Sequence, residues 1–200
     1  MISISNALVR APMFAGVVVE PNLSVASESP ADSWARERLL DEAFGPARID
    51  KTVERLRENR LPAQGMALAA KDADDLVGTL RMWHILAGEA PALLLGPLAV
   101  AKAYRSRGIG RRLLVEGLFR AASAGHKAIL LVGDAAYYEP FGFSRRHTLK
   151  LSLPGPVDAA RFLGLELKAG ALKGAKSLVT PAGAPAIPAY NVASKLRRAA

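Results

Sequence analysis

Hydrophobic positions in the first half of the chain predict two helices and four strands. Helices are expected over 33–44 and 48–60, and in the second of these Ile49, Val53 and Leu56 form an apolar stripe. Apolar runs bounded by turn residues predict strands over 23–27, 66–71, 76–86 and 92–100. The turns between the last three strands are short enough for an antiparallel meander.

In the second half, the apolar positions of 108–123 lie on one broad helical face, and the fully apolar run 128–132 follows as a strand. A strand, a helix and a strand in this order form a right-handed crossover, so 128–132 is expected to lie parallel to the strand ending at Val100. Such an apolar strand is covered on both sides, which predicts an α/β fold with a mixed sheet and helices on both faces. The remaining expected elements are a short helix at 135–139, a strand at 143–153, a helix at 157–165 and a strand at 175–179.

The length of 200 residues, half of them hydrophobic, suits one domain. We expect an amino-terminal extension at 1–22, the folded domain at 23–180 and a basic, loosely ordered tail at 181–200. No apolar run reaches the ~18 residues that a membrane-spanning helix needs. The absence of cysteine excludes disulfides, thiolate catalysis and cysteine-ligated metal, and it fits a cytoplasmic location. The three histidines lack metal-ligand spacing, so no metal site is expected.

Charge is distributed unevenly along the chain, whose formal net charge is +9. Residues 102–200 hold 17 Lys and Arg against 5 Asp and Glu, whereas residues 1–101 are slightly acidic. A basic half of this kind favours an anionic ligand, because clustered positive charge raises the local concentration of anions. Nucleic acid is the competing explanation, but no recognised nucleic-acid-binding module accompanies the charge.

The turn between the strand at 92–100 and the helix at 108–123 carries the most specific chemical signal. It contains the spacing Arg105-x-x-Gly108-x-Gly110 and arginines at positions 105, 107, 111 and 112. A helix start leaves main-chain N–H groups unpaired and carries partial positive charge, and glycines let a ligand approach the main chain closely. The turn is therefore expected to bind a phosphate or pyrophosphate, the alternative being a plain connection with solvated arginines.

This turn and several further segments resemble the GCN5-related N-acetyltransferase (GNAT) superfamily, and within it the YhbS-like branch. The resemblance runs from about residue 25 to residue 179, and 105–110 matches the coenzyme A pyrophosphate loop. The branch is matched most specifically by Gly133-Asp134, Tyr137-Tyr138 and Phe141-Gly-Phe143. The resemblance implies the GNAT fold and acetyl-CoA as cosubstrate, and it does not fix the acyl acceptor.

The resemblance also implies roles for the strand end and the loop. The main chain of Leu98, Ala99 and Val100 would pair with the pantetheine arm, and an N–H near Leu98 would stabilise the oxyanion of the reaction. The amides of the loop would hold the pyrophosphate, and these residues are Arg105, Ser106, Arg107, Gly108, Ile109 and Gly110. Lys102, Arg111 or Arg112 would meet the ribose phosphate.

Tyr138 matches the Tyr-x-x-x-Gly-Phe ending of these domains, whose tyrosine often acts as general acid toward the departing thiolate. The alternative is that Tyr138 only packs or binds, as expected for its aromatic neighbours. Asp134 either caps the following helix or binds or deprotonates the amine. Many relatives carry a glutamate base on the strand before the loop, but 92–100 contains no acid. The proton acceptor could then be His84, Asp134 or a chain of water molecules, and the base stays unassigned. Of these, His84 fits better as a packed residue of its strand.

The sequence thus predicts an enzyme that transfers an acetyl group from acetyl-CoA to a primary amine by direct attack in a ternary complex. A catalytically silent acetyl-CoA-binding sensor is the alternative from another class, and a nucleic-acid-binding protein ranks third. The acceptor is left open between a protein lysine or amino terminus, a polyamine, an antibiotic and a metabolite. A longer acyl group and a homodimer are also left open.

Overall fold

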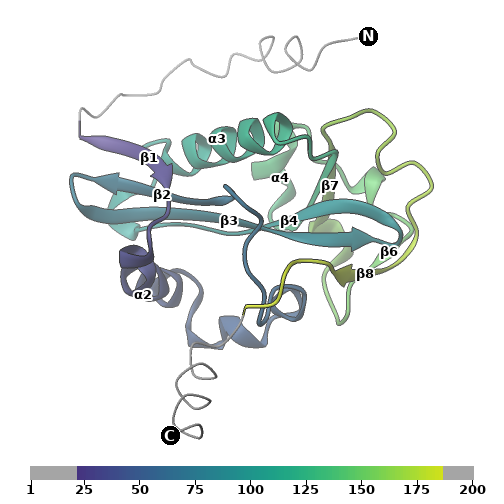
Figure 1. The fold of residues 1–200 in the computed structure, drawn as a ribbon, viewed down its shortest axis with the longest axis horizontal. Coiled ribbons are helices and arrows are strands. Elements are labelled where there is room, and N and C mark those ends of the chain that lie inside the picture. The colour runs from purple at the N-terminus through teal and green to yellow at the C-terminus, as the bar shows by residue number, and fades with distance from the viewer. Residues whose placement is uncertain (1–21, 187–200) are drawn as a thin grey trace, which may run out of the picture.

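A computed structural model describes residues 22–186, which form a twisted sheet flanked by helices (Figure 1). The predicted extension up to residue 21 and the tail from residue 187 lie outside the described residues. The strands of the described part are β1 (Leu23–Ser27), β2 (Ala67–Asp72), β3 (Asp75–Ala87), β4 (Ala90–Val100), β5 (Ala128–Val132), β6 (Leu151–Ser152), β7 (Phe162–Glu166) and β8 (Ser177–Pro181). Between residues 22 and 186, no helix is long and apolar enough to cross a membrane.

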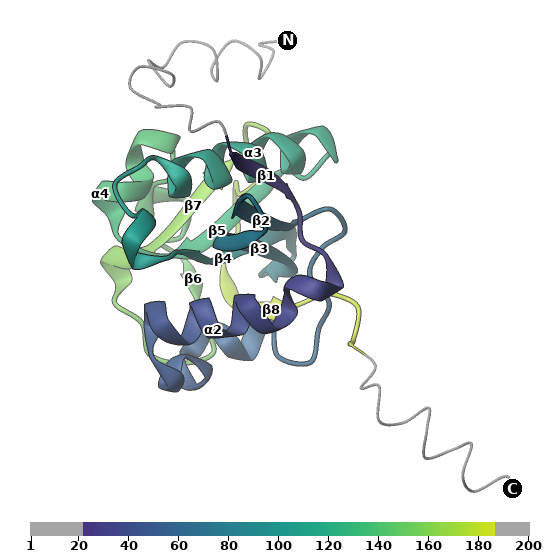
Figure 2. The ribbon, with the colours of Figure 1, turned by 90° about the vertical axis from the view of Figure 1, so that its left-hand side faces the viewer.

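The α-helices of the described part are α2 (Ser33–Phe44), α3 (Ile109–Ser123) and α4 (Ala135–Tyr138). Figure 2 shows α3 and α4 on one face of the sheet and α2 on the other, which confirms the prediction of helices on both faces. Short 3₁₀ turns connect the elements, namely η1 (Pro30–Asp32), η2 (Pro46–Asp50), η3 (Thr52–Leu56), η4 (Lys102–Tyr104), η5 (Glu139–Phe141), η6 (Arg145–His147) and η7 (Ala159–Arg161).

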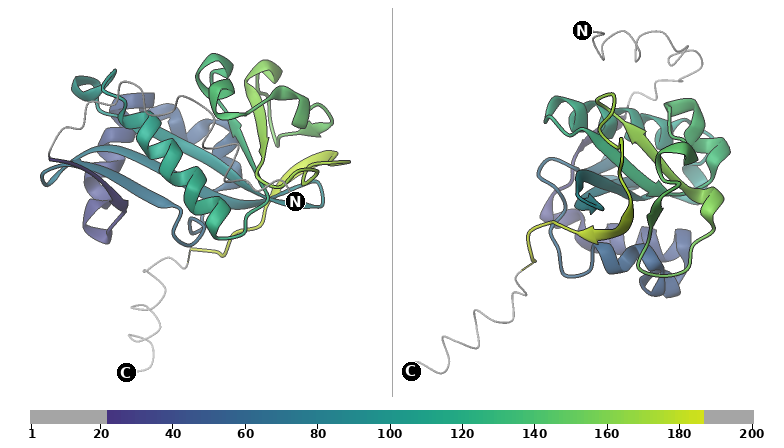
Figure 3. Two further views of the ribbon diagram at one scale, coloured as in Figure 1. Left: turned by 90° about the horizontal axis from the view of Figure 1, so that it is seen from above. Right: turned by 90° about the vertical axis from the view of Figure 1, so that its right-hand side faces the viewer.

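The strand order β1-β2-β3-β4-β5-β7 confirms the predicted mixed sheet. The strands from β1 to β4 pair antiparallel, β4 pairs parallel with β5 through the α3 crossover, and β7 returns antiparallel to β5. β3 is long enough to pair with β2 at its start and with β8 at its end, where Ile85 is opposite Pro181. Seen from above, α3 lies diagonally across the strands (Figure 3).

Apolar side chains are buried on both faces of the sheet, because successive strand residues point to opposite sides. Leu93 packs in the cluster under α3, whereas its neighbour Leu94 packs in the cluster on the opposite face. Gly117 of α3 allows the close contact with β3. A β-carbon at Gly117 would lie 2.9 Å from Met82 Cε and 3.0 Å from Leu80 Cδ2, so a larger residue would require the ends of these side chains to move.

The predicted helix over 48–60 is wrong, because this segment forms the turns η2 and η3. The side chains of Thr52 and Arg55 bond to the main chain of Pro156 and Pro154, respectively. Partners about a hundred residues away therefore hold the segment as tight turns, and the apolar stripe alone does not make it helical.

Two further predictions after residue 142 are wrong. The expected strand at 143–153 is reduced to β6 (Leu151–Ser152). Before it comes the turn η6, and Thr148 Oγ1 next to this turn donates to the Phe162 carbonyl oxygen (2.6 Å). The expected helix at 157–165 is the turn η7 followed by β7. Phe162 and Leu163 belong to the cores on opposite faces of the sheet, so the run alternates with the period of a strand.

The expected tail starts at Pro181, which is the last residue of β8. Beyond β8, the N–H of Ala182 donates to the carbonyl oxygen of His84 (3.0 Å). The N–H of Ala186 donates to the carbonyl oxygen of Asn59 (2.8 Å). The chain therefore stays bound to the folded body up to residue 186.

Candidate functional site

The sheet opens where β4 and β5 separate. The parallel register pairs Leu93 with Ile129 and Leu94 with Leu130, and it extends no further. β4 nevertheless continues along β3 as far as Val100. One edge of the second half of β4 therefore faces a gap instead of a neighbouring strand.

The main chain of Val100 is directed into this gap. The N–H of Ala101 donates to the carbonyl oxygen of Val77 (2.9 Å), just beyond the pair of Val100 with Gly78. In an antiparallel ladder this arrangement identifies a non-hydrogen-bonded pair, whose own N–H and C=O groups are directed away from the partner strand.

The same alternation decides which of the other predicted main-chain partners are available. The register continues without a break from Val100 to the two preceding residues: Ala99 lies opposite Thr79, and Leu98 lies opposite Leu80. Leu98 therefore directs its N–H and C=O groups into the gap like Val100, whereas Ala99 directs its own toward β3. The expectation that Ala99 offers its main chain to a ligand is not supported, because Thr79 occupies those groups.

The loop after β4 leads into the start of α3. Ser106 and Gly108 adopt positive φ angles of 64° and 78°, and Gly108 is the N-cap residue of α3. A β-carbon built at Gly108 would meet no heavy atom within 4 Å, so the space in front of the helix is open. The unpaired N–H groups of the first helical turn face this open space.

Three of the four arginines surround the loop as expected. Arg105 Nε donates to the Val100 carbonyl oxygen (3.2 Å), and the Arg107 guanidinium lies over the ring of Tyr104 at 5.0 Å from its centre. The guanidinium of Arg111 lies 5.7 Å from the centre of the Phe141 ring. These contacts place positive charge beside the end of β4 and the start of α3.

Arg112 is directed elsewhere. Its Nη1 donates to the carbonyl oxygen of Leu23 in β1 (3.0 Å), about one third of a helical turn around α3 from Arg111. The expectation that Arg112 meets a ribose phosphate is not supported, because the helix points this side chain at the outer strand.

A cavity of about 750 Å³ fills the gap between β4 and β5, a size typical of small-molecule sites. Its first wall consists of the end of β4, the start of α3 and the connection from β5 to α4: Leu94, Leu95, Gly96, Pro97, Leu98, Val100, Gly110, Val132, Gly133, Asp134, Tyr137 and Tyr138. Its second wall consists of Phe44, Arg48, Asp50, Lys51, Thr52, Val53, Arg57, Pro156, Val157, Asp158 and Arg161. The fold thus brings together several predicted site residues that are far apart in the sequence.

Tyr138 lines the cavity and is packed from two sides. A β-carbon at Gly133 would overlap its ring, and the ring of Phe143 meets it edge-on at 5.7 Å between centres. Burial, with a smaller effect of Tyr137, raises the pKa of the Tyr138 hydroxyl above its usual value of 10.0, against the opposing charge of Arg161. The hydroxyl therefore holds its proton at neutral pH, as a general acid must.

The structure shows one of the two roles that the sequence left open for Asp134, that of helix cap. Its carboxylate accepts the N–H of Ala136 (3.1 Å) and so caps α4, and it also lines the cavity. His84 is not placed for the role of base. It lies opposite Leu93, where the sheet is still closed, and it lines a separate hollow with His126, whose ring centre is 5.3 Å away.

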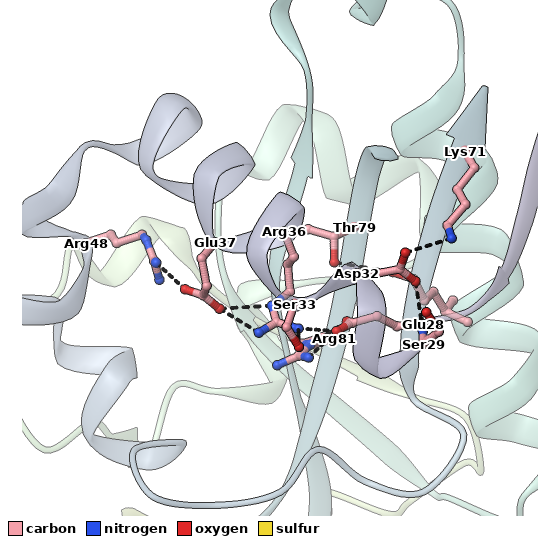
Figure 4. A network of polar contacts seen from close by, with 11 residues as sticks. Glu28, Ser29, Asp32, Ser33, Arg36, Glu37, Arg48, Lys71, Thr79 and Arg81 are labelled. Atoms are coloured by element: carbon pink, nitrogen blue, oxygen red, sulfur yellow. Dashed lines mark hydrogen bonds and ion pairs between the residues drawn. The ribbon is translucent and has the colours of Figure 1, made fainter. Parts of the chain in front are cut away.

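None of the residues of the second wall was predicted as a site residue. Arg48 is held there by an ion-pair network that includes Glu37, Arg36, Glu28 and Arg81 (Figure 4). Burial alone would raise the pKa of Glu37, but hydrogen bonds from Arg36 and Arg48 lower it below its usual value. Charges of alternating sign therefore fix α2 and Arg48 against the sheet.

Tyr137 is a cavity residue whose placement was also missed, since it was expected only to pack. It is 40% exposed, its ring meets that of Tyr138 edge-on at 4.9 Å between centres, and it faces Gly110 at the start of α3. Within residues 22–186, His, Cys, Asp and Glu form no cluster of three or more that could hold a metal ion.

Comparison with known proteins agrees with this geometry. Residues 63–145 match the model of the acetyltransferase (GNAT) domain. The chain is 32% identical over 156 residues to the uncharacterized N-acetyltransferase YhbS of Escherichia coli strain K12, covering 76% of this chain and 92% of that protein.

Solved structures show the same fold. The crystal structure of E. coli YhbS in complex with CoA superposes with a TM-score of 0.67 at 29% identity, covering 80% of this chain and 90% of that one. A GNAT family acetyltransferase from Brucella melitensis in complex with acetyl-CoA superposes with a TM-score of 0.55 at 24% identity, covering 84% and 96%. The chain therefore belongs to the GNAT family of N-acetyltransferases, which are acyltransferases.

Proposed function

We propose that this protein transfers an acetyl group from acetyl-CoA to a primary amine while both substrates are bound. The observation that carries the proposal is the cavity, which combines the free main-chain edge of β4 with the open start of α3 and with the hydroxyl of Tyr138. The CoA complex of YhbS, a relative of similar fold, supports the same assignment. We place the activity in the domain at 23–186 and in the cytoplasm.

The residues present fit the coenzyme. The C=O group of Leu98 and the N–H and C=O groups of Val100 would pair with the amides of an extended pantetheine arm, as an added strand does. The amides of the 105–110 loop would surround the pyrophosphate at the start of α3, where the helix dipole favours negative charge. Arg105 and Arg111 would add positive charge beside it, whereas the buried side chain of Ile109 would leave only its main chain for binding.

When bound, acetyl-CoA supplies an acetyl thioester, which yields the acetylated amine and the free thiol of the coenzyme. The N–H of Leu98 is free to donate toward the thioester carbonyl oxygen, and one such donor typically contributes ~2.7–4 kcal/mol to the lowering of a barrier. Tyr138 Oη holds the proton that the departing sulfur needs. Holding the two substrates side by side supplies a further large part of the acceleration.

The amine must lose a proton before it can attack, and β4 carries no acidic residue for this purpose. Asp134 is the carboxylate of the first wall and stands beside Gly133 at the end of β5. Proton removal therefore falls to Asp134, to a chain of water molecules, or to an acceptor that arrives uncharged.

Release of the CoA thiol in the presence of a panel of amines tests the proposal. The chain contains no cysteine, so a thiol-specific reagent reports only the coenzyme. We expect turnover with at least one primary amine and thermal stabilisation by acetyl-CoA, which amounts to ~2.7 kcal/mol at 100 times the dissociation constant. Stabilisation without turnover on any amine would favour the catalytically silent sensor.

A further inference from the structure

The second wall of the cavity is a closed structure made of two distant segments. Thr52 Oγ1 donates to the Pro156 carbonyl oxygen (2.8 Å), and Arg55 Nη1 donates to the Pro154 carbonyl oxygen (2.6 Å). Gly155 fits between these bridges, because a β-carbon there would lie only 2.8 Å from Thr52 Oγ1. The turn η3 and the loop before η7 are thus joined into one wall over the place where an acceptor would bind.

This closure favours a small acceptor. An extended peptide that presents a lysine needs an open groove with room for the chain on both sides of the modified residue. Here the bridged segments form one side of the cavity, whose volume of about 750 Å³ must also hold the arm of the coenzyme.

Two of the positive charges in this wall are already neutralised. Arg48 is bound by Glu37 and by Asp41, whose Oδ1 accepts from its Nε at 2.8 Å. Arg57 is bound by Glu54 (2.6 Å) and lies over the ring of Trp83. These arginines hold the wall together and add little free positive charge.

Arg161 differs from them. Within residues 22–186, its guanidinium makes no hydrogen bond or ion pair, although it lines the cavity and its charge acts on the hydroxyl of Tyr138. Its main chain is nevertheless fixed. The carbonyl oxygen of Arg161 accepts the N–H of Gly133 (2.9 Å). The N–H of Arg161 donates to the carbonyl oxygen of Asp158 (3.0 Å), the N-cap residue of the turn η7. Arg161 therefore places a positive charge in the cavity wall without an ion-pair partner among residues 22–186, as does Lys51, whose Nζ lies over the ring of Phe44. The carboxylates of Asp50 and Asp158 also line the cavity.

A negative charge lies on the neighbouring strand end. Asp134 follows Gly133, the residue bonded to Arg161, and its carboxylate is exposed to the cavity with one N–H bond from Ala136. One end of the cavity thus offers a guanidinium and a carboxylate beside Tyr138. A ligand that carries both an ammonium and an anionic group matches this pair of charges.

We propose that the acceptor is a small amino acid–like molecule, with a primary amine for acetylation and a carboxylate that Arg161 binds. This inference rests on the proposed function and adds the class of the acceptor. Arg161 acts in it as a specificity-determining residue, because a fork of N–H donors can bind a carboxylate through two parallel hydrogen bonds.

Three pairs of amines, each consisting of a carboxylate and its uncharged amide, test the proposal: glycine and glycinamide, β-alanine and β-alaninamide, and 4-aminobutyrate and 4-aminobutanamide. We expect kcat/KM for at least one carboxylate to exceed that for its amide by about 10- to 100-fold, as hydrogen bonds to a charged group allow. Arg161→Gln should bring this ratio close to one by lowering kcat/KM for the carboxylate, and Arg161→Lys should retain part of it.

Arg146→Gln is the matched control. Arg146 is exposed and does not line the cavity, so the same loss of charge should leave the ratio unchanged. Thermal melting of each variant shows whether it is folded. If Arg161→Gln does not fold, Arg161→Lys decides the matter, since it keeps the charge but loses the fork and should still reduce the ratio.

A binding measurement separates this proposal from the proposed function. In the presence of saturating CoA, the carboxylates should raise the Tm of the protein but not that of Arg161→Gln, and the amides should raise neither. Such stabilisation without any turnover would refute the proposed function and with it the role of the carboxylates as acceptors, leaving Arg161 as a binding residue for small carboxylates. Turnover that ignores the carboxylate, or that is best with a lysine-containing peptide, would overturn the acceptor class and leave the proposed function intact. Neither turnover nor stabilisation with any carboxylate would overturn the acceptor class, and the absence of turnover with every amine would overturn the proposed function as well.

Discussion

The hydroxyl group of Tyr137 lies directly against the main chain of Gly110. A β-carbon built at Gly110 would lie 2.8 Å from Tyr137 Oη, closer than real contacts allow. The next atoms, Val100 Cγ2 at 3.6 Å and Tyr137 Cζ at 3.9 Å, are at ordinary contact distance. The tyrosine hydroxyl is therefore the one atom that would have to move to admit a β-carbon at this position of α3.

This relationship predicts that the effect of Gly110→Ala depends on Tyr137. Alanine is favoured over glycine in a helix by about 1 kcal/mol, so Gly110→Ala should stabilise the Tyr137→Phe variant by roughly that amount. In the natural chain the clash with Oη should cancel the gain, and the displaced ring should raise the Kd for CoA several-fold.

Urea unfolding and CoA titration of the natural chain, both single variants and the double variant measure this dependence. Equal effects of Gly110→Ala in the two backgrounds would show that Tyr137 Oη does not occupy the space in front of Gly110.

Tyr138→Phe should lower kcat by about 10²- to 10⁴-fold, because it removes the proton donor but keeps the ring that packs on Gly133. Its Kd for CoA should change by less than about threefold, since the hydroxyl acts on the reacting sulfur and not on binding. Tyr137→Phe is the control within the same helix and should keep most of kcat.

Steady-state kinetics and calorimetry of both variants provide the comparison. If Tyr138→Phe weakened CoA binding as much as it lowered kcat, the hydroxyl would be a binding group, and the acid would have to be sought elsewhere.

Adjacent arginines at the start of α3 should affect different properties. Arg112 donates to the Leu23 carbonyl oxygen of β1, so Arg112→Gln should cost about 1 kcal/mol of folding free energy and leave CoA binding unchanged. Arg111 lies over Phe141 beside the cavity, so Arg111→Gln should raise the Kd for CoA several-fold, with less effect at high salt. Unfolding curves and CoA titrations in low and high salt test both statements, and a reversed assignment would contradict the orientation of the helix.

The first wall of the cavity could be predicted because its signals are local. The strand that ends at Val100, the glycines at 108 and 110 and the apolar face of α3 each lie in one short stretch of sequence. The alternation of strand residues also explains why Leu98 and Val100 face the cavity and Ala99 does not. That distinction depends on the register with β3, which the sequence alone does not specify.

The second wall could not be predicted, because contacts between distant segments create it. The bridge from Thr52 to Pro156 spans 104 residues, and no local pattern in either segment indicates that the two meet. The run that begins with Phe162 and Leu163 fitted a helix as well as a strand, and pairing with β5 decided for the strand. Arg161 reaches the cavity only because this strand begins directly after it.

Stability at low pH should depend on Asp32, which joins α2 to β2. Its Oδ1 lies 2.7 Å from Lys71 Nζ, and its Oδ2 accepts the N–H of Ser29 at 2.8 Å (Figure 4). Burial raises the pKa of this carboxyl, but the bonds from Lys71 and Ser29 outweigh it and lower the pKa below its usual value of 3.8. Because the pKa is lower in the folded than in the unfolded state, this stabilisation is fully present above the unfolded value and is lost as the pH falls through the folded one.

Asp32→Asn should therefore reduce the free energy of unfolding at neutral pH by about 1–3 kcal/mol and flatten its decline in acid. The control Asp74→Asn, at an exposed position, should do neither. Urea unfolding at a series of pH values measures both curves, and parallel acid declines for the natural chain and Asp32→Asn would show that this carboxylate is not held by Lys71.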